Sequence, residues 1–458
     1  MQFWKQIDFS DPRVRWVSCL LFLDLAFLFW FRPFPILYQV GPIDAYCYMD
    51  QLLTYLNLPL VGCETKFHFP GAPMLWFPLA WIVEQLASLF GADPQRWVMA
   101  VVGYSGFLFW GLGVLILDRL FQKIRLPLVL VLVFSVTVPI LEWVFQSPRL
   151  SHASEFMVAA AALYFLFDRR YVLCLGFCFF LGAIRLNDFP VILLLLGKLL
   201  DEVDDFSKPS LERKWLFGAG VAAILFSVFG LYLSVVKGYG GASYLHLVLK
   251  EITPGVAFRY LFTWGEGFVF VHPAWFSVLV LGLWNLKHMT WLSRFALVWM
   301  LLQLTVAIGW DPDSMRLMSR YYVGSYFGAL VVAVDLWGRL SPAWRKLGSA
   351  ATVWTALRQL LVLWTQNTRY SFATVSGMGW LTSLLMMPLL IAVTPLGILA
   401  YSWASVLEWH LGWTPSFGPL SGVELGSLTV ITLGCLGHGL YCLRALLLLR
   451  QFPQGSQA

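Results

Sequence analysis

Long apolar runs separated by short polar segments make up most of the chain. A helix needs about 20 apolar residues to cross a bilayer, and by this criterion we predict about 12 membrane spans. The pattern therefore predicts an all-α polytopic membrane protein with about 12 transmembrane helices. The spans lie near residues 14–32, 97–117, 126–146, 152–168, 171–184, 188–200, 215–236, 272–286, 291–309, 321–338, 377–401 and 427–448.

Two stretches depart from this pattern. Residues 73–90 are apolar enough to form a span, but Trp76, Trp81 and Glu84 are typical of a helix lying at the membrane interface. Because a span here would also move Arg119 to the outer side, we predict an interfacial helix. Residues 350–372 alternate apolar with charged and aromatic positions, which predicts an amphipathic cytoplasmic helix within a connector at 339–376.

The composition excludes a globular enzyme with a single anchor. Hydrophobic residues make up 59% of the chain and charged residues 12%, and the mean hydropathy is +0.73. The polar segment 1–11 precedes an apolar run that no small-residue cleavage site follows, so we expect a retained span and not a signal peptide.

The seven cysteines show no metal-ligand spacing. Five fall within apolar runs, where cysteine usually behaves as a small buried hydrophobic residue. Cys47 and Cys63 share one outer segment and would form a disulfide if that compartment is oxidising. The sequence does not test the geometry that such a bond requires.

The basic residues orient the predicted helices. With a cytoplasmic N-terminus, about 21 of the 31 Lys and Arg residues fall on the inner side and about 10 on the outer side. This bias predicts an integral multi-pass protein, of the bacterial inner membrane, with both termini cytoplasmic. The net charge of +6 then reports orientation and does not indicate a nucleic-acid surface.

The predicted outer side carries the candidate site. It holds a long first segment near 33–96, a second at 237–272, and short polar corners at 147–151, 185–188 and 310–320. Ionisable residues at membrane depth are costly, so several near one surface indicate a shared polar cavity. Headgroup snorkelling would account for single arginines. The corner residues of interest are Arg149, His152, Glu155, Arg185, Asp188, Asp311, Asp313, Arg316 and Arg320.

Short motifs follow one another in order along the first 338 residues. An acid followed by aromatic residues, Asp-Ala-Tyr-Cys-Tyr, begins at Asp44, and Phe-His-Phe-Pro-Gly-Ala-Pro begins at Phe67. Others are Phe-Gly-Ala-Asp-Pro-Gln-Arg at 90–96, Ser-Pro-Arg-Leu-Ser-His at 147–152, Gly-Ala-Ile-Arg at 182–185, Thr-Trp-Gly-Glu-Gly at 263–267 and Ser-Arg-Tyr-Tyr at 319–322. In their order and membrane side they resemble the GT-C superfamily of membrane glycosyltransferases, which includes the protein O-mannosyltransferases and the lipid A aminoarabinose transferases.

The resemblance implies a GT-C-like catalytic module at 1–338, with interfacial helices in the first outer loop. It assigns Asp44 the role of general base toward an acceptor hydroxyl, with inversion at the sugar. Two departures matter: Ala45 follows Asp44 where the family often has a second acid, and we expect no carboxy-terminal soluble domain. The predicted two extra helices at 377–458 align with nothing, and they could be a family-specific addition or a docking surface for a partner subunit.

A polyprenyl-phosphate donor has a phosphate leaving group that needs charge neutralisation. Arg presents a planar fork suited to oxyanions. The expected partners are a polyprenyl-phosphate-linked sugar, membrane lipids and a glycan, lipid or protein acceptor, with no nucleic acid. We expect no cofactor, although a divalent cation at His68 or His152 stays open. The predicted donor and substrate site comprises Lys66, His68, Arg149, His152, Glu155, Arg185, Asp188 and Arg320.

Two other classes of protein remain open. A non-catalytic scaffold subunit of a membrane complex could keep the same architecture, and the single acid of the first loop is compatible with lost activity. A lipid or solute transporter would also have about 12 spans, but it should show two matching halves, and none is evident between 14–236 and 272–448.

Overall fold

The structure is a computed structural model, and all regular elements in the part of the chain that it describes are helices. Within that part, α5 (Pro94–Lys123) and residues Trp291–Ile308 of α16 (Trp291–Trp310) are long and apolar enough to cross a membrane. The all-α prediction is therefore confirmed for these residues, and the number of spans stays a prediction. The described residues are 10–30, 43–63, 70–141, 144, 151–202, 215, 217–222, 252–262, 268–310, 322–367 and 422–451.

Most described helices coincide with predicted spans. The first outer segment instead contributes α3 (Ile43–Tyr55) and α4 (Gly71–Leu89), of which α4 matches the predicted interfacial helix in extent. The predicted span at 377–401 lies outside the described residues. The helices at predicted spans are α1 (Pro12–Trp30), α5, α6 (Leu128–Thr137), α8 (His152–Phe167), α9 (Tyr171–Ile184), α10 (Ile192–Asp201), α15 (Pro273–Trp284), α16, α18 (Val323–Trp337) and α22 (Gly422–Gln451).

Proline shortens two of the predicted spans. The span expected at 126–146 ends as an α-helix at Thr137, because Pro139 forces the preceding Val138 into an extended conformation with ψ 131°. The span expected at 188–200 divides into the 3₁₀ helix η2 (Leu186–Val191), which contains Pro190, and α10. Proline has no N–H to donate to the preceding turn, so it does not continue a regular α-helix there.

The helix ends predicted to face the cytoplasm are joined by ion pairs. Arg15 at the start of α1 is 4% exposed and lies 2.8 Å from Asp118 near the end of α5. Lys123 pairs with Asp168, where α8 ends. The two oxygens of Asp201, at the end of α10, accept from the first two backbone N–H groups of α16 at 2.7 and 3.0 Å. A carboxylate at a helix N-terminus satisfies donors that have no partner within the helix.

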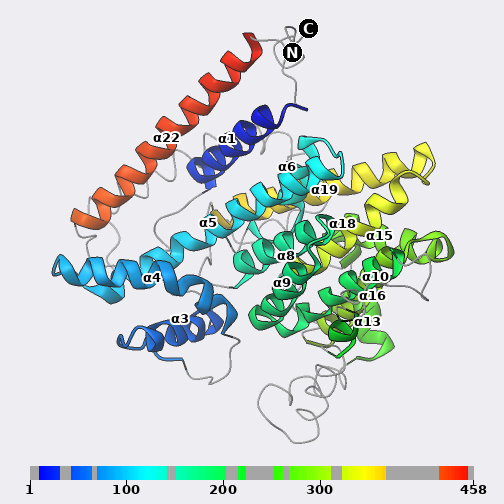
Figure 1. The fold of residues 1–458 in the computed structure, drawn as a ribbon, viewed down its shortest axis with the longest axis horizontal. Helices are drawn as coiled ribbons and strands as arrows, with labels where there is room; N and C mark the ends of the chain where they lie inside the picture. The colour runs from blue at the N-terminus through cyan, green and yellow to red at the C-terminus, as the bar shows by residue number, and fades with distance from the viewer. Residues whose placement is uncertain are drawn as a thin grey trace, which may run out of the picture.

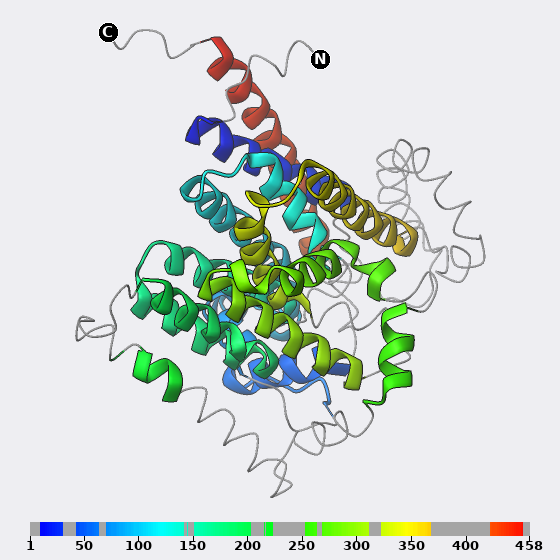
Figure 2. The ribbon, with the colours of Figure 1, turned by 90° about the vertical axis from the view of Figure 1, so that its right-hand side faces the viewer.

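The helices of the first outer segment lie at the other end of the bundle. In Figure 2, the first residues of α1 and the last of α22 lie at the top and α3 and α4 near the bottom. Gly71 opens α4 directly against the backbone of α9, since a Cβ at Gly71 would lie 2.6 Å from the carbonyl carbon of Ala183. This contact requires glycine, and it holds the start of α4 beside the end of α9, where Arg185 follows.

The predicted connector at 339–376 includes a long helix, α19 (Pro342–Asn367), that packs against α6 and α15 (Figure 1). The hydroxyl of Thr355, which is fully buried, accepts from the backbone N–H of Ala274 at 3.3 Å. The connector therefore contributes a helix to the bundle, and its cytoplasmic location stays a prediction.

Candidate functional site

Four of the residues predicted from separate polar corners meet at one end of the bundle. His152 and Glu155 lie in the first turn of α8, Arg185 follows the last turn of α9, and Asp188 lies in η2. Glu155 and Asp188 are fully buried and His152 is 2% exposed. We call these four residues the polar cluster. Tertiary packing alone brings them together, because 33 residues separate His152 from Arg185.

Glu155 is the centre of the polar cluster. Its Oε1 accepts from the backbone N–H of Gly324 at 2.9 Å, which ties α8 to the first turn of α18. Its Oε2 lies 3.7 Å from Nη1 of Arg185 and 3.1 Å from Nδ1 of His152. A buried carboxylate is stable only when it is paired and hydrogen-bonded, and both conditions are met here.

His152 lies between the guanidinium and the carboxylate. Nη1 of Arg185 donates to Nδ1 of His152 at 2.8 Å and lies 3.2 Å from Nε2. A guanidinium only donates, so the imidazole nitrogen facing it must be unprotonated. The same Nδ1 would have to carry a proton to donate to Glu155. Nδ1 can therefore make only one of these two hydrogen bonds at a time. It bonds to Arg185 when it is unprotonated and to Glu155 when it carries the proton.

Asp188 supplies a second buried carboxylate. Its Oδ1 accepts from Nε2 of Gln303 on α16 at 2.7 Å, and its carboxyl group also hydrogen-bonds with that of Glu155. Gly324 lies against both carboxyl groups, since its backbone N–H donates to Glu155 and a Cβ at Gly324 would lie 2.4 Å from Oδ1 of Asp188. Two carboxylates in contact repel each other in a buried site, so a proton shared between Glu155 and Asp188 would be favourable here.

The polar cluster does not have the net positive charge expected of an anion-binding site. It contains two carboxyl groups and one guanidinium, with an imidazole that the contact from Arg185 favours as neutral. Arg185 is thus already compensated by acids of the same chain. The arrangement can store a proton and orient the guanidinium, and additional positive charge for a phosphate would have to come from elsewhere.

A second set of buried polar groups packs nearby and was not predicted from the sequence. The hydroxyls of Tyr260 and Tyr322 lie 2.6 Å apart, and Nδ1 of His272 lies 2.7 Å from the hydroxyl of Tyr326. Tyr322 and Tyr326 lie two residues to either side of Gly324, whose backbone N–H donates to Glu155, so the start of α18 contributes to both sets. Gln303, also missed, stands in a predicted span, and a polar residue inside an apolar run was the signal that could have identified it.

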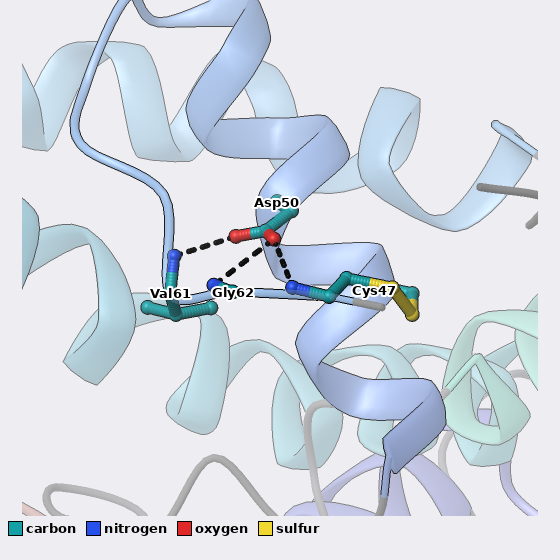
Figure 3. The surroundings of a disulfide bond; sticks show 5 residues. Cys47, Asp50, Val61 and Gly62 are labelled. Carbon is teal, nitrogen blue, oxygen red and sulfur yellow. Dashed lines mark hydrogen bonds between the residues drawn. A yellow bond between two sulfur atoms is a disulfide. The ribbon is translucent and has the colours of Figure 1, made fainter. Parts of the chain in front are cut away.

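The first outer segment is fastened beside the polar cluster. Cys47 of α3 and Cys63 form a disulfide with a Cα–Cα distance of 4.9 Å, so the pairing that the sequence left open is present. Figure 3 shows Asp50 accepting from the backbone N–H groups of Val61, Gly62 and Cys63 at 2.6, 3.1 and 2.6 Å. The disulfide and the carboxylate of Asp50 therefore both hold the loop at 61–63 against α3.

Tyr48 of α3 connects this segment to the polar cluster. Its hydroxyl donates to Oγ of Ser151, the residue before His152, at 3.3 Å. Asp44, the predicted base, belongs to the first turn of α3, one turn before Tyr48. Its side chain lies outside the described part of the structure, as do all of Lys66, His68, Arg149 and Arg320. The roles predicted for these five residues stay predictions.

Possible metal ligands can be compared only among the described residues. Among them, the one group whose ligand atoms come close enough to hold a cation is Asp24, His438 and Cys442, which lies on α1 and α22 and does not include the polar cluster. The chain matches no protein-family model, no curated protein and no solved structure.

Proposed function

We propose that the protein is a multi-pass membrane glycosyltransferase that moves a sugar from a polyprenyl-phosphate donor to an acceptor hydroxyl. One observation carries the proposal: His152, Glu155, Arg185 and Asp188 meet in a buried polar cluster, at the end of the bundle where α3 and α4 are fastened. Functional residues commonly lie in loops held by a rigid scaffold, and the polar corners of this chain have that placement.

The proposed reaction takes place at the outer membrane face. The disulfide between Cys47 and Cys63 supports an oxidising compartment for the first outer segment, as in a periplasm or lumen. The ion pairs at the opposite end agree with the charge bias that predicts a cytoplasmic side there. We therefore propose a bacterial inner-membrane location with both termini in the cytoplasm.

The proposed chemistry is a single displacement with inversion. Asp44 removes the proton from the acceptor hydroxyl as general base. Arg149, Arg320, Lys66 and His68 neutralise the leaving phosphate, because negative charge develops there as the sugar leaves. No cofactor is part of the proposal.

Arg185 has a different place in this scheme from the other basic residues. Glu155 and His152 hold its guanidinium by contacts of 3.7 and 2.8 Å, so it enters the reaction already oriented. We propose that a donor phosphate competes for one face of this guanidinium, while Glu155 keeps it from turning away. Orientation of this kind lowers the entropy lost on binding.

The test is transfer of a labelled sugar in liposomes containing purified full-length protein and a polyprenyl-phosphate-linked donor. Asp44→Asn should lower the transfer rate by about 10²–10⁴-fold, as expected for loss of a general base, and leave donor affinity within about twofold. Glu84→Gln, an acid on α4 of the same outer segment, is the matched control and should keep the wild-type rate. Full activity in Asp44→Asn would remove the assigned base.

Arg185→Ala should instead weaken donor binding, because it removes a phosphate contact and not a proton acceptor. Arg13→Ala is the control, because it removes an exposed arginine at the start of α1, at the end of the bundle opposite to the polar cluster. Donor affinity unchanged in Arg185→Ala would assign this residue a structural role only. An absence of transfer by wild-type protein with every polyprenyl-linked sugar tried would favour the scaffold-subunit alternative.

A second candidate function is a proton-coupled membrane carrier. It is favoured by the excess of acid in the polar cluster, where the buried carboxyl groups of Glu155 and Asp188 hydrogen-bond with each other, because buried acids in helical bundles are typical of proton relays. A carrier would move an entrapped solute across the liposome membrane in response to a pH gradient, with loss of this response in Asp188→Asn. Sugar transfer without any such gradient dependence would exclude it.

A further inference from the structure

The first and last described helices, α1 and α22, pack against each other in antiparallel directions. Val14 near the start of α1 packs with Leu446 near the end of α22, and Asp24 further along α1 contacts His438 further back along α22. Figures 1 and 2 show the two helices at the same side of the bundle. The glycosyltransferase proposal makes no use of this helix pair.

Three potential metal ligands meet in the middle of this helix pair. Nδ1 of His438 donates to Oδ2 of Asp24 at 2.8 Å, and Sγ of Cys442 lies 3.8 Å from Nε2 of His438. The three side chains offer ligand atoms that all lie within 4.8 Å of one another. His438 and Cys442 are four residues apart, so they share one face of α22. Gly439, between them, packs directly on Asp24, with its Cβ position 3.5 Å from that of the aspartate.

These side chains stand in apolar surroundings that make a bare charge costly. Both helices coincide with predicted spans, and Asp24 is only 9% exposed. An ionisable residue inside a membrane helix is expensive and is expected to have a functional partner. The hydrogen bond from His438 accounts for one carboxylate oxygen of Asp24, and Sγ of the buried Cys442 lies 3.8 Å from the same imidazole.

We propose that Asp24, His438 and Cys442 bind Zn²⁺. The set combines a carboxylate, an imidazole and a thiol, and these are the ligand types that zinc takes. When the thiol is ionised, the carboxylate and the thiolate carry two negative charges and the imidazole is neutral. These charges neutralise a divalent cation, which lowers the free-energy cost of the site inside a bilayer. Ligand atoms around a tetrahedral zinc lie about 3.3–3.8 Å apart, so small side-chain rotations suffice.

Three protein ligands leave one coordination position for water. The side chain of His438 is 46% exposed, so no other described residue closes this side of the site. Cys435 precedes His438 by one helical turn, but it lies outside the group of three whose ligand atoms are mutually close. The metal would tie the first helix of the bundle to the last, since Asp24 comes from α1 and the other two ligands from α22.

Zn²⁺ binding to purified full-length protein in detergent tests the proposal, by competition with a chromogenic chelator and by metal content after removal of free zinc. Wild-type protein should bind one equivalent. His438→Gln and Cys442→Ser should each weaken binding by at least about tenfold, since loss of even an outer-shell partner of a metal ligand costs about 10–100-fold in affinity. His288→Gln, at an exposed histidine of η3 (Leu286–His288), and Cys174→Ser, at a buried cysteine of α9, should bind as wild type.

Co²⁺ in place of Zn²⁺ keeps the test decisive if a variant fails to fold. Wild-type protein should show thiolate-to-cobalt charge-transfer absorption that disappears on adding chelator. Absence of this absorption in folded wild-type protein would overturn the proposal. So would equal zinc affinity in wild type and Cys442→Ser, or an equal loss in Cys174→Ser, because the assigned thiol would then not be a ligand.

Discussion

Gly324→Ala is the substitution that most directly tests the geometry of the polar cluster. The new Cβ would lie 2.4 Å from Oδ1 of Asp188, 3.0 Å from its Cγ and 3.1 Å from Cζ2 of Trp299. Asp188 is fully buried and already accepts from Gln303, so it has no free direction in which to move. The backbone N–H of Gly324 would also shift from its 2.9 Å contact with Glu155.

The magnitude follows from three contributions. Overpacking a close contact costs about 1–3 kcal/mol, and disturbing a hydrogen bond to a charged group costs about 1.5–3 kcal/mol. Replacing glycine with alanine in a helix gains up to about 1 kcal/mol, and less in the first turn where Gly324 lies. We expect a net loss of about 2–6 kcal/mol in the free energy of unfolding.

Gly328→Ala is the matched control, one turn further along α18. A Cβ there would meet Cε3 of Trp299 at 3.2 Å and the carbonyl oxygen of Ala296 at 3.3 Å, distances that shifts of a few tenths of an ångström relieve. The full helix-propensity gain applies at this interior position. Its stability should stay within about 1 kcal/mol of wild type, by unfolding in detergent followed by tryptophan fluorescence.

A double-mutant cycle identifies the cause. Asp188→Ala removes the clashing oxygen, so Gly324→Ala should cost at least about 1 kcal/mol less in that background. Asp188→Asn keeps an atom at the same position and should give no such relief. Equal costs of Gly324→Ala in wild type and in Asp188→Ala would refute the packing of these two residues, and so would equal stabilities of Gly324→Ala and Gly328→Ala.

Three further substitutions probe contacts away from the polar cluster. Asp118→Asn leaves the buried charge of Arg15 without its 2.8 Å partner and should lower the free energy of unfolding by about 3–5 kcal/mol; a loss under 1 kcal/mol would contradict burial of this pair. Asp50→Asn replaces one acceptor oxygen of a clamp on three backbone N–H groups and should cost about 1.5–3 kcal/mol, with faster proteolysis at 61–63 as the second readout and unchanged proteolysis as the contrary result. Burial raises the pKa of Glu202, but hydrogen bonds from Tyr171 and Lys198 outweigh it and hold the pKa below 4.5. The ionised carboxylate therefore stabilises the fold at neutral pH, and this stabilisation is lost as the pH falls through the lowered pKa. Glu202→Gln should flatten the acid side of a plot of the free energy of unfolding against pH, and an unchanged plot would refute the link between Glu202 ionisation and stability.

The apolar pattern was sufficient to predict most helices, because a run of apolar residues near 20 long has few alternatives to a helix in a bilayer. The helices α1, α5, α8, α9, α16 and α18 follow predicted spans closely. Where the prediction was wrong, at α6 and η2, proline ended or tightened the helix. Pro139 and Pro190 marked these interruptions in the sequence, but the spans were predicted from hydropathy alone.

The sequence also predicted which polar residues to examine. It identified His152, Glu155, Arg185 and Asp188 because ionisable groups are rare at the edge of apolar runs. It paired Cys47 with Cys63 only conditionally, and the structure brings their Cα atoms to 4.9 Å. The composition and the order of these residues along the chain were enough for this step.

Only the tertiary structure decided what these residues contact. Gly324 and Gln303 complete the polar cluster from helices more than 100 residues away in sequence, and nothing in their local surroundings marks them as partners of Glu155 and Asp188. The same holds for Asp24, whose partners His438 and Cys442 come from the last helix. Hydropathy is a property of short windows, whereas hydrogen bonds, ion pairs and metal ligation depend on distances of a few ångströms between helices, and helix packing alone sets those distances.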